Sequence, residues 1–174
     1  MAECADHNDK VTILIEYKPR EPRRYCFVDS AAKVLLLLRD LDKVKVLLDV
    51  GHSLQGRENA AEAVALLAHY GKLEYIHLND NYGDWDDDMM IASVHVPQYL
   101  EFMYWLKRVG YKGWLTLDIF PFREDGLRAA NECREWIEAL DRTIDRIGMD
   151  KIAKVIEGAD ATQASALIRE ALRL

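Results

Sequence analysis

The sequence has 174 residues, half of them hydrophobic, which is enough for one globular domain with a real core. Its formal net charge of -7 argues against a nucleic-acid backbone as partner. No apolar run reaches the ~18 residues that a membrane span needs, so no membrane partner is expected. The polar, acidic N-terminus does not resemble a signal peptide. The three cysteines (Cys4, Cys26 and Cys133) have no CxxC spacing, which favours reduced thiols and a cytoplasmic location.

Four short apolar runs predict four β-strands, at 11–16, 44–49, 73–79 and 114–118. Each run is almost continuously apolar, as expected of strands that are buried on both faces. The first strand stops abruptly at Glu16 and Lys18, and Pro19 and Pro22 then end regular structure.

Helical segments alternate with these strands. The pattern predicts helices at 30–40, 58–70, 96–109 and 127–147, and one or two further helices at 151–156 and 161–172. Ser30 is a suitable cap for the first helix, while Gly71 and Gly110 follow the ends of the second and third. Strict alternation predicts an α/β fold with a parallel sheet and helices outside it. Right-handed crossovers then place the carboxyl ends of all four strands at one edge.

That edge collects side chains that can ligate cations or carry charge. They are Glu16, Lys18, Asp49, His52, His77, Asp86, Asp88 and Asp118. Five carboxylates in one cleft would repel each other unless cations neutralised them. Carboxylates mixed with imidazoles, and without thiolates, suit Mg, Mn or Co.

Each of these residues has a structural explanation as well. Asp49 and Asp118 could cap the segments that follow them, and His77 could be a hydrogen-bonded core histidine. The acidic run 86–88 could be a solvated loop. These residues occur at the ends of four successive predicted strands, which favours a shared metal site over a separate structural role for each residue.

The motifs resemble those of the xylose-isomerase-like barrels, and most closely the sugar isomerases of the L-rhamnose and D-xylose isomerase type. Residues 15–22 read Ile-Glu-Tyr-Lys-Pro-Arg-Glu-Pro and resemble the family's E-x-K-P-x-x-P signature. Asp49 and His52 match its D-x-x-H step, and His77 matches a strand-end ligand. The run 85–88, Trp-Asp-Asp-Asp, matches its W/Y-D-x-D loop, and Asp118 matches the aspartate of its last strand.

The resemblance implies the C-terminal half of a (β/α)8 TIM barrel, with four βα units over residues 1–148 and a helical tail over 149–174. It also implies two divalent cations, Mn, Mg or Co. The first would be held by Glu16, Asp49, His77 and Asp118, and the second by His52, Asp86 and Asp88, with Asp49 reaching toward both. Lys18, His52 and Asp86 would be catalytic. Lys18, Trp85 and Phe120 would contact the substrate, and Tyr17 and Phe122 could also wall the site.

The implied activity is aldose–ketose isomerisation of a sugar by a metal-assisted hydride shift. Two alternatives stay open. One is a sugar 3-epimerase of the same superfamily, although Asp118 then stands where a glutamate is expected. The other is a half-barrel that binds metal without turnover, because four strands are half of the eight in a barrel. An unpaired sheet edge predicts either self-association or pairing with a missing N-terminal half-barrel.

Overall fold

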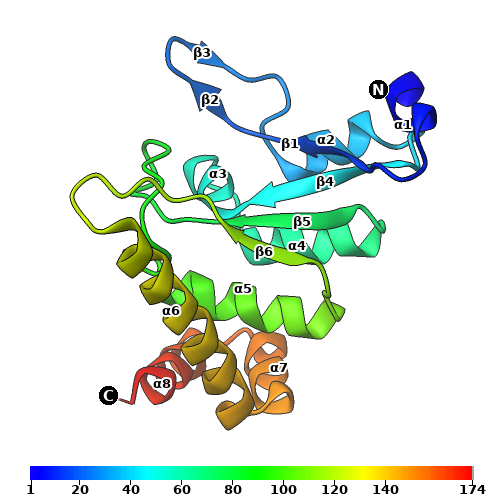
Figure 1. Ribbon diagram of the computed structural model, residues 1–174. Helices are drawn as coiled ribbons and strands as arrows, with labels where there is room; N and C mark the ends of the chain where they lie inside the picture. The colour runs from blue at the N-terminus through cyan, green and yellow to red at the C-terminus, as the bar shows by residue number, and fades with distance from the viewer. Residues whose placement is uncertain (174) are drawn as a thin grey trace.

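The computed structural model describes residues 1–173 and contains a four-stranded parallel sheet. Its strands are β1 (Ile13–Glu16), β4 (Val44–Asp49), β5 (Leu73–Leu78) and β6 (Trp114–Leu117), in the order β1-β4-β5-β6. The strands point the same way, so their carboxyl ends meet at one edge of the sheet (Figure 1). The predicted α/β fold with a parallel sheet is therefore confirmed.

The strand register separates the two faces of the sheet. Asp49 lies beside His77, which lies beside Thr116. Paired residues of parallel strands share a face, so this face presents Asp49 and His77 together. On the opposite face Leu48 and Ile76 are fully buried beneath the helices.

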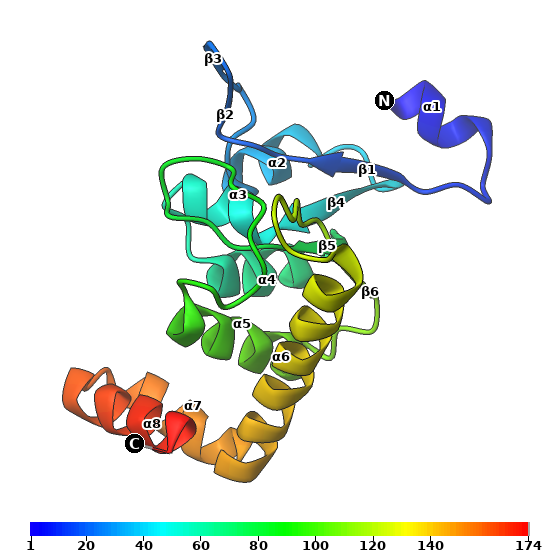
Figure 2. The ribbon, with the colours of Figure 1, turned by 60° about the vertical axis from the view of Figure 1, so that its left-hand side comes forward.

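Four helices cover that opposite face: α2 (Ala31–Leu37), α4 (Ala60–His69), α5 (Val96–Val109) and α6 (Gly126–Ile147). Figures 1 and 2 show α4, α5 and α6 following one another around the sheet. Ser30 caps α2 through its hydroxyl, and Asn59 and Asp125 cap α4 and α6 through their side-chain oxygens. Gly110 ends α5 in the left-handed region (φ 68°), which a glycine adopts without strain.

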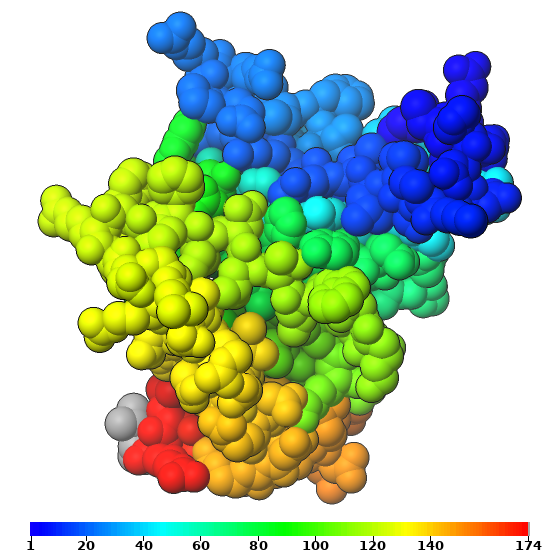
Figure 3. Space-filling model, in the orientation of Figure 1, coloured from blue at the N-terminus to red at the C-terminus, as the bar shows by residue number. Residues whose placement is uncertain are grey.

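Four elements are absent from the sequence prediction. They are the helix α1 (Ala2–His7), the helix α3 (Val50–Gln55) and an antiparallel hairpin of β2 (Arg20–Glu21) and β3 (Arg24–Tyr25). The prolines had indicated that regular structure ends after β1, but Pro19 directly precedes β2 and Pro22 lies in the turn between β2 and β3. In the space-filling view this hairpin and α1 form two separate projections at the top of the molecule (Figure 3).

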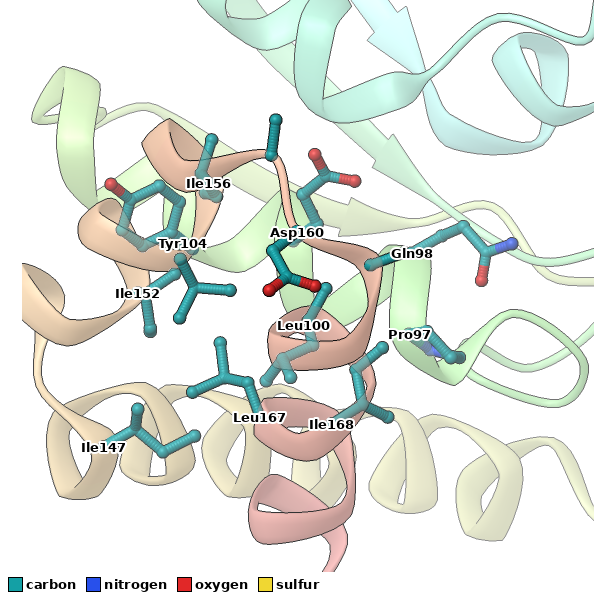
Figure 4. A pocket seen from close by; sticks show the side chains of 15 residues that line it. Pro97, Gln98, Leu100, Tyr104, Ile147, Ile152, Ile156, Asp160, Leu167 and Ile168 are labelled. Atoms are coloured by element: carbon teal, nitrogen blue, oxygen red, sulfur yellow. The ribbon is translucent and has the colours of Figure 1, made fainter.

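The tail folds as two helices, α7 (Met149–Gly158) and α8 (Ala161–Leu172), in the region where the sequence predicted one or two. Between α5, α7 and α8 lies an apolar pocket of about 490 Å³, lined by side chains such as Tyr104, Ile152 and Leu167 (Figure 4). This pocket lies on the helical side, away from the carboxyl edge of the sheet. None of the described helices combines the length and apolarity needed to cross a bilayer.

Candidate metal centre

Four successive sheet strands bring four candidate ligands together at the carboxyl edge. Glu16, Asp49 and His77 lie in β1, β4 and β5, and Asp118 follows β6 directly. Each can place one ligand atom within 4.8 Å of the others. Their strands are adjacent, so the convergence follows from the sheet topology rather than from a flexible loop.

His77 lies at the centre of this group. Its Nδ1 is 3.4 Å from Glu16 Oε1, 3.6 Å from Asp49 Oδ2 and 3.3 Å from Asp118 Oδ2. The nitrogen is buried, yet none of these contacts has the geometry of a directed hydrogen bond. The carboxylates of Asp49 and Glu16 raise the pKa of His77 to about 10, against the opposing effect of partial burial. The buried Nδ1 of His77 thus faces three carboxylate oxygens. Together these four atoms form a set of ligands that a divalent cation could bind.

Asp49 is held rigidly for this role. It is fully buried, and its two oxygens accept hydrogen bonds from the side-chain amide of Asn79 at 3.1 and 3.0 Å. Its Oδ1 also accepts from the backbone N–H of His52 and so caps α3. Gly51 makes room for this arrangement, because a Cβ there would lie 1.8 Å from the amide oxygen of Asn79. Asp49 is therefore both a helix cap and a candidate ligand, two explanations that the sequence had posed as alternatives.

A second group contains Asp49, His52 and Asp86. The Nδ1 of His52 is 3.0 Å from the carbonyl oxygen of Tyr17, so this nitrogen donates its proton there and Nε2 faces Asp86 Oδ2 at 3.2 Å. Burial opposes ionisation of Asp86, but His52 and Lys18 outweigh it and lower the pKa of the carboxyl. The other oxygen of Asp86, Oδ1, is buried without a partner in the described chain.

Lys18 reaches the same carboxylate. Its Nζ lies 2.8 Å from Asp86 Oδ2 and 3.2 Å from Glu21 Oε1. Burial lowers the pKa of Lys18, but these two carboxylates offset it and the net shift is upward. The side chain therefore keeps its positive charge at neutral pH and stands beside the second group.

Three other predicted residues lie around the groups rather than in them. Asp88 falls outside both sets of converging atoms; burial, followed by Asp86 and Asp118, raises its pKa to about 6. Trp85 is partly exposed, with the Arg20 guanidinium 5.2 Å from its ring centroid. Phe120 is exposed, and its backbone N–H donates to the carbonyl of Asp88.

Tyr17 had been offered as a wall of the site, but only 1% of it is exposed and it belongs to the core. Its hydroxyl donates to Glu58 Oε2, which also accepts from the hydroxyl of Ser53. The other oxygen of Glu58 accepts from the backbone N–H of Ala31. This buried network fixes the backbone of Tyr17, whose carbonyl orients His52. Nothing in the sequence pattern singled out Glu58.

Sequence reasoning also missed the clamp that holds the acidic loop. Asp80 is fully buried and accepts hydrogen bonds from the backbone N–H groups of Val94 and His95 and from His95 Nδ1. Its backbone pairs with Met89 in both directions, closing the loop that carries Asp86 and Asp88. The available signal in the sequence was that Asp80 directly follows the strand predicted at 73–79. Its role as a hydrogen-bond acceptor could not be foreseen, because the donors Val94 and His95 lie 14 and 15 residues later.

Known proteins resemble this chain in sequence and in fold. A family model for the xylose isomerase-like TIM barrel matches residues 1–142. A xylose isomerase of Dinoroseobacter shibae is 26% identical in an alignment of 159 residues, and the alignment covers 87% of this chain but 36% of the relative.

Two solved structures share the fold. A D-tagatose 3-epimerase-like protein aligns with a TM-score of 0.66 and 21% identity over 82% of this chain and 53% of its own. A xylose isomerase domain protein of Alicyclobacillus acidocaldarius aligns with a TM-score of 0.55 and 24% identity over 73% of this chain and 49% of its own. The chain thus spans about half the length of each structure and about a third of the curated relative.

Proposed function

Because the chain belongs to the xylose isomerase-like TIM barrel family, we propose that it forms the metal-binding half of a sugar isomerase that interconverts an aldose and a ketose. The observation that carries this proposal is the convergence of Glu16, Asp49, His77 and Asp118 at the ends of four neighbouring strands. A xylose isomerase is among the relatives, which supports the choice of reaction.

The residues fit divalent cations on their own chemistry. The orphaned Nδ1 of His77 faces three carboxylate oxygens, and the orphaned Oδ1 of Asp86 lies in the neighbouring group. Oxygen and imidazole ligands without thiolate suit Mn, Mg or Co. We propose two cations, one held by the His77 group and one by His52 and Asp86, and we propose that Asp88, which lies outside both groups of converging atoms, joins the second site when the ion binds. When bound, such ions polarise a carbonyl and lower the pKa of water.

The chain's own residues would contribute charge and position. The Lys18 ammonium, held by Asp86, would stabilise the sugar oxygen on which negative charge develops. Asn79 and the helix cap keep Asp49 in one orientation. The carbonyl of Tyr17 fixes the tautomer of His52, so that Nε2 is presented to the site. Trp85 and Phe120, exposed beside the acidic loop, would cover one side of the sugar.

We also propose that the open face of the sheet is closed by an N-terminal half-barrel. Trp114 lies in register with Tyr75 and Leu47 on this face, yet it is 74% exposed. The edge strands β1 and β6 each pair on one side only. A second copy of this chain would bring a second set of carboxylates to the same end of the barrel, where the two sets would repel each other. A half-barrel of different sequence is therefore the better partner. The free cysteines fit the cytoplasmic location that we propose.

Titration of the chelator-stripped chain with Mn²⁺ in a calorimeter tests the metal site. We expect saturable binding of two ions, weakened strongly in His77→Ala and unchanged in the control His69→Ala, which alters an exposed histidine of α4. Absence of specific binding, or equal loss in both variants, would overturn the proposal.

The reaction is tested by sugar conversion in D₂O, with the chain alone and with an N-terminal half-barrel supplied. A hydride shift retains the migrating hydrogen, so the ketose should carry no deuterium from the solvent. Solvent deuterium at C3 would instead assign the 3-epimerase alternative, and metal binding without any conversion would assign the inactive half-barrel.

A further inference from the structure

A polar pocket of about 390 Å³ lies beside the metal groups and has no part in the chemistry above. It is bounded by the β2–β3 hairpin, the end of α3 and the start of the acidic loop. Its lining includes Arg20, Tyr25, Gln55, Arg57 and Asp84. Helix α3 reaches the hairpin closely at this point, because a Cβ on Gly56 would lie 3.1 Å from the ring of Pro19.

Gln55 indicates that the pocket is built for a ligand. The residue is only 8% exposed, yet neither Oε1 nor Nε2 of its side chain has a hydrogen-bond partner in the described chain. An unpaired buried amide destabilises the folded state, so folded proteins rarely leave one without a hydrogen-bond partner. A polar ligand in the pocket would supply the missing partner.

Two guanidinium groups indicate the charge of that ligand. Arg20 and Arg57 line the pocket, and neither has a carboxylate partner or a side-chain hydrogen bond within the described residues. Arg20 rests against the face of Trp85, an arrangement that leaves the N–H groups at its edge free.

Two carboxylates in the lining reduce the positive charge of the pocket but do not remove it, because Lys33 adds a third positive charge. Asp29 also lines it, but Lys33 neutralises this carboxylate at 2.7 Å. Asp84 is exposed to solvent. Although the whole chain has a net charge of -7, this pocket is lined by two arginines without a carboxylate partner. The unpaired side-chain amide of Gln55 lines the same pocket.

We propose that this pocket binds a phosphate group. Two guanidinium charges match the charge of about -2 on a phosphate monoester, and the Gln55 amide would donate to one of its oxygens. The pocket adjoins the second candidate metal group through two short connections: Gln55 is on the same helix as His52, and Trp85 precedes Asp86. The substrate class that follows, which rests on the proposed isomerase function, is a sugar phosphate whose phosphate lies away from the reacting carbonyl.

Titration of the chelator-stripped chain with inorganic phosphate at low ionic strength tests the site without involving metal or turnover. We expect one saturable site, with affinity reduced at least tenfold in Arg57→Ala and in Arg20→Ala. The matched control is Arg24→Ala, which removes the same charge from the same hairpin at a residue outside the pocket lining. No saturable binding, or equal weakening in Arg24→Ala, would overturn the proposal.

Gln55→Leu separates a ligand site from a structural role. Because it removes an unpaired amide, this variant should unfold at a higher temperature than the wild type while binding phosphate more weakly. A variant that loses stability and keeps its phosphate affinity would contradict the role given to Gln55.

The source of the phosphate is settled by comparing a ketose phosphate, the neutral ketose and inorganic phosphate on the Mn²⁺-loaded chain. Tighter binding of the ketose phosphate than of either part identifies a substrate phosphate. Equal affinity for ketose phosphate and inorganic phosphate identifies free phosphate as the ligand. Failure of the isomerase proposal would appear separately, in the Mn²⁺ titration, and would leave the phosphate result intact.

Discussion

Binding of a divalent cation to this chain should release about one proton from His77. The carboxylates around its Nδ1 raise the pKa of this imidazole to about 10. At pH 8, roughly 99% of the His77 side chains in the metal-free protein therefore carry a proton. A metal ligand must be the neutral imidazole, so the proton has to leave when the cation enters.

Calorimetric titration with Mn²⁺ at pH 8, in two buffers of different ionisation enthalpy, measures the number of protons released. The informative variant is His77→Asp, which keeps a ligand at the same position but has no proton to lose, since a carboxylate is already ionised. We expect proton release to fall by about one in this variant while metal binding persists. In the wild type, the apparent affinity should rise about tenfold per pH unit below the pKa, over and above the dependence in His77→Asp.

Other groups do not imitate this difference. Asp88, with a pKa of about 6, is almost fully ionised at pH 8. His52, whose pKa is raised by Asp86 and Asp49 against the effect of burial, is present in both proteins and cancels in the comparison. Equal proton release from wild type and His77→Asp would refute the reasoning, because it would mean that His77 is neutral before the metal arrives or does not ligate it.

Three further perturbations follow from the structure. Gly51→Ala should lower Mn²⁺ affinity at least tenfold in a calorimetric titration, because the new Cβ displaces Asn79, whose amide orients the carboxylate of Asp49. The control Gly158→Ala places its Cβ in open space and should leave the affinity unchanged. The pKa of Asp88 is raised to about 6 in the folded state, so the metal-free chain loses stability as pH rises through about 6. Asp88→Asn should remove this loss, which is about 1 kcal/mol of unfolding free energy after allowance for solvent screening. The melting temperature at pH 8 should therefore rise by roughly 2–4 °C. A melting temperature that also rises in Asp84→Asn, in the exposed part of the loop, would point to net charge instead. The isolated chain should self-associate through its open sheet face, and Trp114→Lys should restore the monomer by light scattering; a monomeric wild type would contradict this.

The strands and the convergence of the candidate ligands at their ends could be predicted from the sequence because simple constraints act on them. A strand buried on both faces must be apolar, so a charged or imidazole side chain at its end is conspicuous. The same reasoning could not find the hairpin at 20–25, because Pro19 and Pro22 disrupt long strands but permit two short ones around Arg23, whose φ is 71°. The short helix α3 was missed since Asp49 ends one element and caps the next without a loop.

The supporting residues were harder to predict because their roles depend on partners that are distant in sequence. Glu58 acquires its role from Tyr17 and Ser53, and Asp80 from His95 and the backbone beside it. Both are charged residues that composition alone assigns to the surface. Only the folded arrangement shows that each is a hub of buried hydrogen bonds.

The unsatisfied polar groups of the described chain are confined to its carboxyl edge. Buried side-chain atoms without a partner occur in Gln55, His77, Asn79 and Asp86, and none lies in the core between the sheet and its helices. A fold that satisfies its core and leaves these atoms open is adapted to ligands at that edge. Mn²⁺ and phosphate should therefore each raise the free energy of unfolding, by about 2.7 kcal/mol at a hundredfold excess over the dissociation constant. Arg20 contacts Trp85, and Trp85 precedes Asp86, so this short segment connects the two proposed sites. An effect of the two ligands together that exceeds the sum of the separate effects would show that the sites are coupled. Strict additivity would show that they are independent.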